Sequence, residues 1–129
     1  MPNTGDRFIA TLKQAHLEWG THRHTNSRGI IYGEGYLQIP SDVSYSLEIT
    51  NNKSDARSAE YDFKTSDGYI EDGKLLASGN QHREEFAKQF QGLGNLKLLG
   101  DWFNSIEAVE GDRIQIDFIS PTAILLTKI

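Results

Sequence analysis

The chain of 129 residues has no cysteine, which excludes disulfide bonds and thiolate metal sites. It also lacks any run of the ~20 apolar residues that a membrane-spanning helix needs. The segment from Met1 to Asp6 has neither the basic start nor the apolar run of a secretory signal. These absences predict a soluble, cytoplasmic protein, and the length predicts a single domain over residues 1–129.

The chain also lacks an excess of positive charge. Its net charge is −5, whereas proteins that bind nucleic acid usually carry a basic face. The charges are unevenly spread, however. Residues 13–28 hold three cations and three of the four histidines against Glu18 alone, while residues 101–117 hold five carboxylates against Arg113 alone. This distribution predicts one cationic edge and one acidic flank.

Short segments in which apolar and polar residues alternate dominate the chain and predict β-strands. Between them lie turn signals, such as Asp67-Gly68 and Gly111-Asp112. The strands expected on this basis cover residues 36–39, 45–50, 59–64, 69–78, 114–118 and 123–127, the first of them ending at Pro40.

Helical spacing of apolar residues predicts a short N-terminal helix within residues 7–19 and a second helix over residues 96–106. Residues 84–90 also fit a helix, because Phe86 and Phe90 are one turn apart. Residues 20–35 and 91–95 are expected to be loops. Many short strands with one or two short helices predict a mainly β (α+β) fold, a seven-stranded-like open pseudobarrel.

In their order along the chain, these segments resemble the B3-like DNA-binding pseudobarrel. That domain occurs in plant transcription factors and as the target-recognition domain of type II restriction endonucleases, and the resemblance is nearest to restriction enzymes whose nuclease half is of the phospholipase-D type. The residues that carry it are Leu17-Glu18-Trp19-Gly20, Arg28 with Gly35-Tyr36-Leu37-Gln38-Ile39-Pro40, Phe63-Lys64-Thr65-Ser66-Asp67-Gly68, residues 94–100 with Trp102-Phe103, and Gly111-Asp112.

The resemblance implies that double-stranded DNA lies in a groove between two arms, residues 20–35 and 79–97. It implies target recognition in a restriction-modification system, with a nuclease domain or subunit as partner, and neither catalysis nor a cofactor. In such a groove, Arg, Asn and Gln side chains read base edges, while Lys side chains bind phosphates. The DNA-binding residues expected on this basis are Trp19, His22, Arg23, His24, Asn26, Arg28, Asn80, Gln81, Arg83, Lys88, Gln91, Asn95 and Lys97.

Two other functions stay open. One is a small metal-dependent enzyme in which His16, His22 and His24 bind zinc or iron. No third ligand has metal-like spacing, and Arg23 would place a repulsive charge near the ion, so His16 is expected instead to pack against the barrel. The other is a protein-interaction barrel whose acidic flank meets a basic partner.

Overall fold

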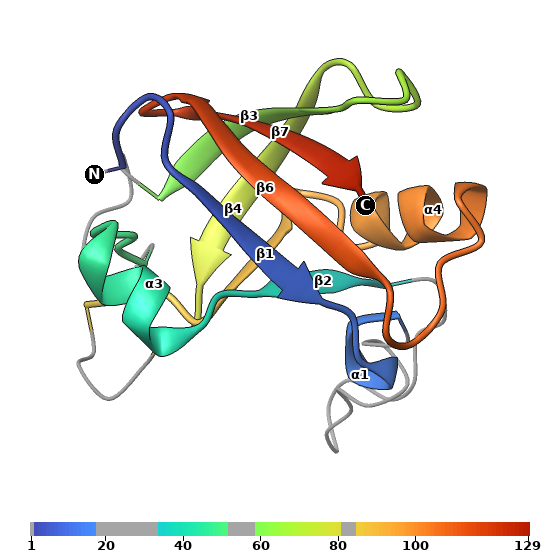
Figure 1. The fold of residues 1–129 in the computed structure, drawn as a ribbon, viewed down its shortest axis with the longest axis horizontal. Coiled ribbons are helices and arrows are strands. Elements are labelled where there is room, and N and C mark those ends of the chain that lie inside the picture. Colours follow the sequence, from blue (N-terminus) through green and yellow to red (C-terminus); the bar gives the residue numbers. More distant parts are fainter. Residues whose placement is uncertain (1, 18–33, 52–58, 81–84) are drawn as a thin grey trace.

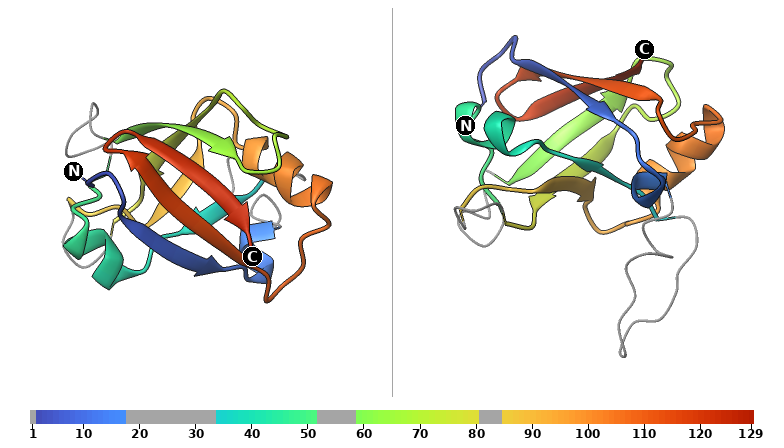
Figure 2. Two further views of the ribbon diagram at one scale, coloured as in Figure 1. Left: turned by 45° about the horizontal axis from the view of Figure 1, so that its top comes forward. Right: turned by 60° about the horizontal axis from the view of Figure 1, so that its bottom comes forward.

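The computed structural model describes residues 2–17, 34–51, 59–80 and 85–129. In these residues seven strands form one mixed sheet, in the order β1-β6-β7-β3-β4-β5-β2, which curls nearly into a barrel (Figures 1 and 2). This confirms the predicted mainly β, open pseudobarrel with short helices. The strands are β1 (Arg7–Thr11), β2 (Tyr36–Gln38), β3 (Glu60–Thr65), β4 (Gly73–Ser78), β5 (Gln89–Gly92), β6 (Arg113–Ser120) and β7 (Ala123–Lys128).

Three helices are described: α1 (Gln14–Leu17), α3 (Ser41–Ser46) and α4 (Leu98–Ser105). Helices α3 and α4 lie at opposite ends of the barrel (Figure 1). None of the helices in the described ranges has the length and apolar character needed to cross a membrane. From their positions, the helices cover the ends of the barrel and connect strands.

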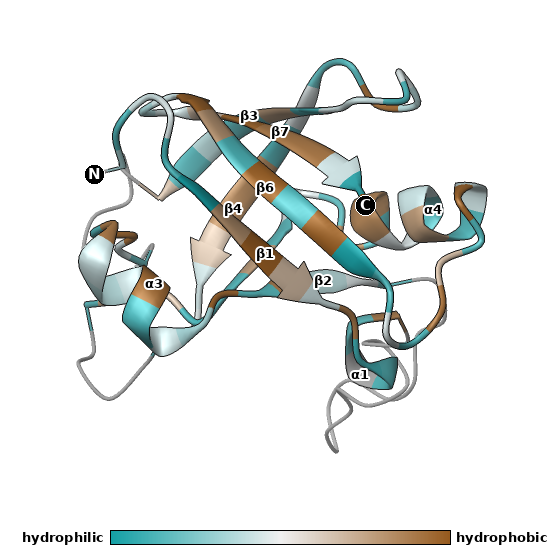
Figure 3. Ribbon diagram, viewed as in Figure 1, coloured by the Kyte–Doolittle hydropathy of each residue, from teal (hydrophilic) through white to brown (hydrophobic). Residues whose placement is uncertain are grey.

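Aromatic side chains fill the inside of the barrel. Apolar and polar residues alternate along β6 (Figure 3), which sends every second side chain inward. The Tyr61 ring lies 5.4 Å from that of Phe90 and 5.9 Å from that of Phe118, and all three side chains are buried. Each such side chain stabilises the fold by roughly 1.5–3 kcal/mol relative to an exposed one. The inward positions of Tyr61 and Phe63 confirm the alternation predicted for residues 59–64.

Helix α4 forms within residues 96–106, where a helix was predicted, and it closes one end of the barrel. Its Trp102 is 1% exposed, and the indole N–H donates a hydrogen bond of 3.0 Å to the Asp67 carboxylate. Asp67 also accepts a bond from the Tyr69 main chain within the turn that Gly68 completes at φ +81°. Asp67 is therefore a turn residue that ties the β3–β4 connection to the helix.

The N-terminal helix predicted for residues 7–19 is wrong over its first half. Residues 7–11 form β1, whose side chains alternate between exposed and buried positions. Phe8 and Leu12 are four residues apart, a spacing that puts both on one face of either a helix or a strand. Residues 7–11 form a strand because they pair with β6, and only Gln14–Leu17 is helical.

Residues 45–50, predicted as a strand, lie instead in α3 and the turn after it. Pro40 directly precedes the helix, which its fixed φ of −57° suits. The buried Ser44 hydroxyl then donates a hydrogen bond of 2.8 Å to the main-chain oxygen of Ala87. The strand pairing expected here is reduced to one isolated bridge between Thr50 and Phe86.

The helix considered for residues 84–90 is wrong where the structure describes it, and the loop predicted for residues 91–95 is wrong for residues 91–92 but confirmed for residues 93–95. Residues 89–92 form β5, which pairs with β4 and β2. Phe90 is fully buried, so this segment contributes to the core. Residues 69–72 form bends before β4 starts at Gly73, later than the strand predicted from residue 69.

Candidate nucleic-acid interface

The outer surface of β4, β5 and β2 is a row of uncharged polar side chains. Since Leu37, Phe90 and Ala77 point inward, their neighbours along the strands point out. The register places Gln38 opposite Gln89 and places Gln89 opposite Ser78. We call this surface the glutamine face, and its members are Tyr36, Gln38, Leu76, Ser78, Gln89 and Gln91.

Hydrogen bonds within the glutamine face set the direction of its amides. The Gln91 Oε1 atom accepts bonds from the Ser78 hydroxyl at 2.7 Å and from Gln89 Nε2 at 3.1 Å. Both donors therefore hold one end of the Gln91 amide, which leaves its NH₂ end available to a ligand. The six members of the face include no carboxylate, but the exposed Glu60 of β3 lies directly opposite Leu76 in the register, so one carboxylate borders the face.

An exposed lysine lies beyond each end of β5, although strand alternation directs the Lys88 side chain to the same side as Phe90, away from Gln89 and Gln91. Lys88 directly precedes β5, where its main chain donates to Ser78 (2.8 Å) and accepts from Ile39 (2.8 Å). Lys97 precedes α4 at the other end of β5. Neither lysine forms an ion pair within the part of the chain that the structure describes. Their charges are therefore available to phosphates.

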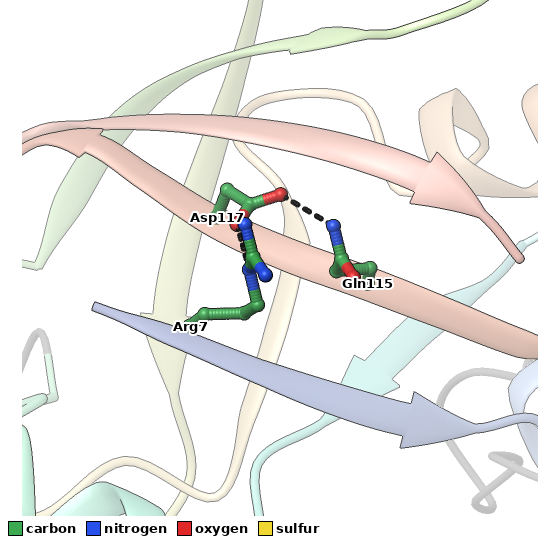
Figure 4. Close-up of polar contacts among 3 residues, drawn as sticks. All are labelled: Arg7, Gln115 and Asp117. Atoms are coloured by element: carbon green, nitrogen blue, oxygen red, sulfur yellow. Dashed lines mark hydrogen bonds and ion pairs between the residues drawn. The ribbon is translucent and has the colours of Figure 1, made fainter. Parts of the chain in front are cut away.

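Three other described cations are paired with carboxylates, while Lys13, Lys64 and Arg113, like Lys88 and Lys97, form no ion pair within the described residues. Arg7 of β1 pairs with Asp117 of β6, and Asp117 also accepts a bond of 2.9 Å from Gln115 (Figure 4). On β3 and β4, Asp62 pairs with Lys74, and the Lys128 ammonium lies 3.5 Å from Asp112. Unpaired cations within the described residues therefore also occur on β3 (Lys64) and β6 (Arg113).

Four of the expected site residues, Asn80, Lys88, Gln91 and Lys97, lie on or beside the glutamine face. Asn80 is exposed and follows Gly79, whose main-chain oxygen accepts a bond of 2.9 Å from Asn51. The expected residues that lie outside the described part of the chain are Trp19, His22, Arg23, His24, Asn26, Arg28, Gln81 and Arg83.

The second arm, expected over residues 79–97, is divided by β5. Residues 79–80 and Lys88 lie at one end of the strand, and Asn95 and Lys97 lie at the other. The Asn95 Oδ1 atom accepts a bond of 3.0 Å from the Lys97 main chain, so that oxygen stabilises a turn. The expectation that neither arm needs burial is also wrong, since Phe90 is in the core.

The first arm rejoins the barrel beside Lys97. Gly35 donates a main-chain hydrogen bond of 3.2 Å to Leu96, and a Cβ at this glycine would lie 3.0 Å from both Gly100 N and the Phe103 ring. The described end of the first arm is thus at the α4 end of the glutamine face, whereas residues 79–80 are at the α3 end. The two arms therefore begin from opposite ends of one surface.

Of this surface, Gln91 was an expected site residue and Gln89 belongs to the predicted second arm, whereas sequence reasoning did not indicate Tyr36, Gln38, Leu76 or Ser78. Polar residues at every second position of three segments are the signal that could have found them. The pairing of β4 with β5 and of β5 with β2 is also required, because these segments are far apart in sequence. The resemblance predicted that the DNA-reading side chains lie on the two arms, whereas the amide side chains of this surface lie on strands.

His16 packs against the barrel, as expected. Its side chain is 1% exposed, its ring lies 4.7 Å from that of Tyr36, and Nδ1 accepts a bond of 3.2 Å from the Lys13 main chain. Burial lowers the pKa of His16, the nearby Gln38 side chain opposes that shift as an acceptor that favours the charged ring, and the Lys13 charge adds to it. The described residues contain no group of His and carboxylate side chains placed to hold a metal. The metal site considered above also needs His22 and His24, which lie outside the described residues.

No protein-family model matches this sequence, and no curated protein matches it.

Proposed function

We propose that this barrel binds double-stranded DNA sequence-specifically, with the glutamine face and the two arms directed at one groove. In this proposal it is the target-recognition domain of a restriction-modification system and works with a nuclease domain or subunit. Its role is recognition alone, without catalysis or a cofactor. The observation that supports the proposal is a carboxylate-free row of amides with an exposed, unpaired lysine beyond each end of β5.

The chemistry of the row suits base reading. A glutamine amide carries a donor and an acceptor side by side, which match N6 and N7 of adenine in the major groove. Each such contact discriminates against the wrong base by about 1–3 kcal/mol. Gln91 has its oxygen engaged by Ser78 and Gln89, so its NH₂ group would donate to a base acceptor while Gln89 and Gln38 supply further amides.

The spacing of the lysines suits phosphate binding on both sides of a groove. Residues 88–92 span roughly 13 Å along the extended strand, and Lys97 lies beyond that end. The major groove of B-DNA is about 12 Å wide. Two phosphate contacts at the edges of the groove would fix the register of the protein, and the amides between them would supply specificity.

The net charge of −5 fits this division of roles. A surface with few phosphate contacts has weak non-specific affinity, because that affinity comes from counterion release. Glu60 and Asp62 lie on the outer side of β3, away from β5 and β2. Binding would therefore depend on the correct base sequence, or on additional charge from the nuclease partner.

Selection from a pool of randomised duplexes at low and at near-physiological salt tests the proposal. We expect a short enriched motif, and we expect Gln91→Ala to relax the preference at one position of that motif. Gln115→Ala is the matched control, because Gln115 is also an outward-facing amide but lies on β6 beside Asp117 (Figure 4). The proposal fails if no motif is enriched at either salt, or if both variants change the motif equally.

A further inference from the structure

The barrel has one open seam, between the two end strands of the sheet. In the order β1-β6-β7-β3-β4-β5-β2, no bridge joins β1 to β2 within the described residues. Following the strand directions around the sheet shows that β1 and β2 run antiparallel to each other. A cleft of about 280 Å³ lies between them, lined by β1 residues, His16, Gln38 and Pro40.

The edge of β1 that faces the seam carries unpaired main-chain groups. The Leu12 N–H donates to Asp112 at 2.7 Å, and the Leu12 oxygen accepts from Gly111 at 2.8 Å, both toward β6. Successive residues of a strand direct their main-chain groups to opposite sides. Ile9 and Thr11 therefore point theirs into the seam, and neither forms a main-chain hydrogen bond within the described ranges.

The facing edge of β2 is arranged in the same way. The Ile39 N–H donates to Lys88 beside β5 at 2.8 Å. The main-chain groups of Gln38, one residue earlier, therefore point away from β5 and into the seam. Donors and acceptors thus face the cleft from both strands.

A buried imidazole adds a further unsatisfied donor. Nδ1 of His16 accepts a hydrogen bond from Lys13, so the neutral ring carries its proton on Nε2. Nε2 is buried and has no hydrogen-bond partner of normal geometry, although the Gln38 side chain lies nearby. A buried polar group left in this state is costly, and His16 lines the cleft.

We infer that the seam binds two or three residues of an extended segment from a partner protein, which pairs with the edge of β1 as an added strand. Alternating donors and acceptors at 3.2–3.4 Å intervals match a polypeptide main chain. The DNA backbone offers phosphate acceptors but no donors for the Ile9 and Thr11 carbonyls. A carbonyl of the partner segment would accept from His16 Nε2, and a carboxylate side chain would meet Lys13 at the rim.

A display library of random peptides is the probe for this inference, used without DNA so that the result is independent of DNA binding. We expect an enriched peptide that contains an acidic residue, and we expect Ile9→Pro to weaken its binding about tenfold by removing one main-chain donor. Proline is tolerated where an edge strand's N–H faces away from the sheet. Ile9→Val keeps the donor and is the matched control, with unchanged affinity expected.

Methylation of the main-chain nitrogens of the enriched peptide, one at a time, is the second measurement, and it needs no variant protein. Strand addition predicts that methylation weakens binding at every second residue only. The inference is overturned if no peptide is enriched, if Ile9→Pro folds and binds normally, or if methylation shows no alternation. A wild-type dimer that Ile9→Pro dissociates would also overturn it, because a second copy of this chain would then fill the seam.

Discussion

Replacing Lys88 with alanine should weaken DNA binding equally for all sequences and reduce its dependence on salt. The Lys88 side chain is exposed and forms no ion pair within the described residues, while its main chain is held by Ser78 and Ile39. The substitution should therefore leave the barrel intact, with a change in unfolding free energy within about 0.5 kcal/mol.

The size of the effect follows from counterion release. One phosphate contact contributes about 0.9 to the slope of log K against log salt concentration. Loss of the contact should lower that slope by about 0.9 and, at 0.1 M salt, reduce the affinity roughly eightfold. Lys97→Ala should act in the same way, and the double variant should lose about twice as much slope.

Fluorescence anisotropy with one selected duplex, repeated at several salt concentrations, gives the slope directly. Lys74→Ala is the control, because Asp62 already neutralises Lys74. The reasoning is refuted if Lys88→Ala keeps the wild-type slope, or if Lys74→Ala reduces it by the same amount.

Substitutions at three further positions test the fold and its pH dependence, each by urea unfolding. Gly92→Ala should cost about 3 kcal/mol, because its Cβ would lie 2.0 Å from the Asn95 main-chain oxygen; an unchanged midpoint would contradict this. Asp67→Ala should cost about 1–3 kcal/mol by leaving the Trp102 N–H without its acceptor, and Asp67→Asn should recover most of that loss. Burial lowers the pKa of His16 below 6.5, so the unfolded state binds more protons and stability should fall as the pH drops through 6.5. His16→Asn should lose less stability over that range, and equal losses would exclude this cause.

The segments whose residues alternate between clear turn signals could be predicted from the sequence. These include β3, the turn at Asp67-Gly68, β6 and β7, together with the wide apolar stripe of α4. In each of these segments the apolar residues fit only one periodicity, that of a strand or that of a helix, and a turn residue marks the end. Local sequence was therefore sufficient to predict them.

The wrong assignments share one cause, which is a spacing of four residues. Phe8 and Leu12, and likewise Phe86 and Phe90, lie on one face of a helix and also on one face of a strand. Residues 45–49 contain the same ambiguity, and there the helix forms. In these segments the outcome is decided by partners distant in sequence, such as β6 for β1.

The candidate site could be predicted only in part, for the same reason. Lys88, Gln91 and Lys97 were expected from the chemistry of the arms, and they lie along one strand and its ends. Tyr36 and Gln38 were not expected, because nothing in the local sequence places β2 beside β5. A surface made of three strands can be recognised only when the pairing and register of those strands are known.

The contact of His16 with Tyr36 bears on how such a domain could acquire new targets. The two rings are 4.7 Å apart, although 19 residues separate them in the sequence. The described segments that end at Leu17 and begin at Glu34 therefore meet at nearly the same place. Doubling the length of a segment closed in this way costs only about 0.6 kcal/mol. Residues 18–33 could thus be lengthened or exchanged between relatives as a cassette, with the barrel kept as a constant platform.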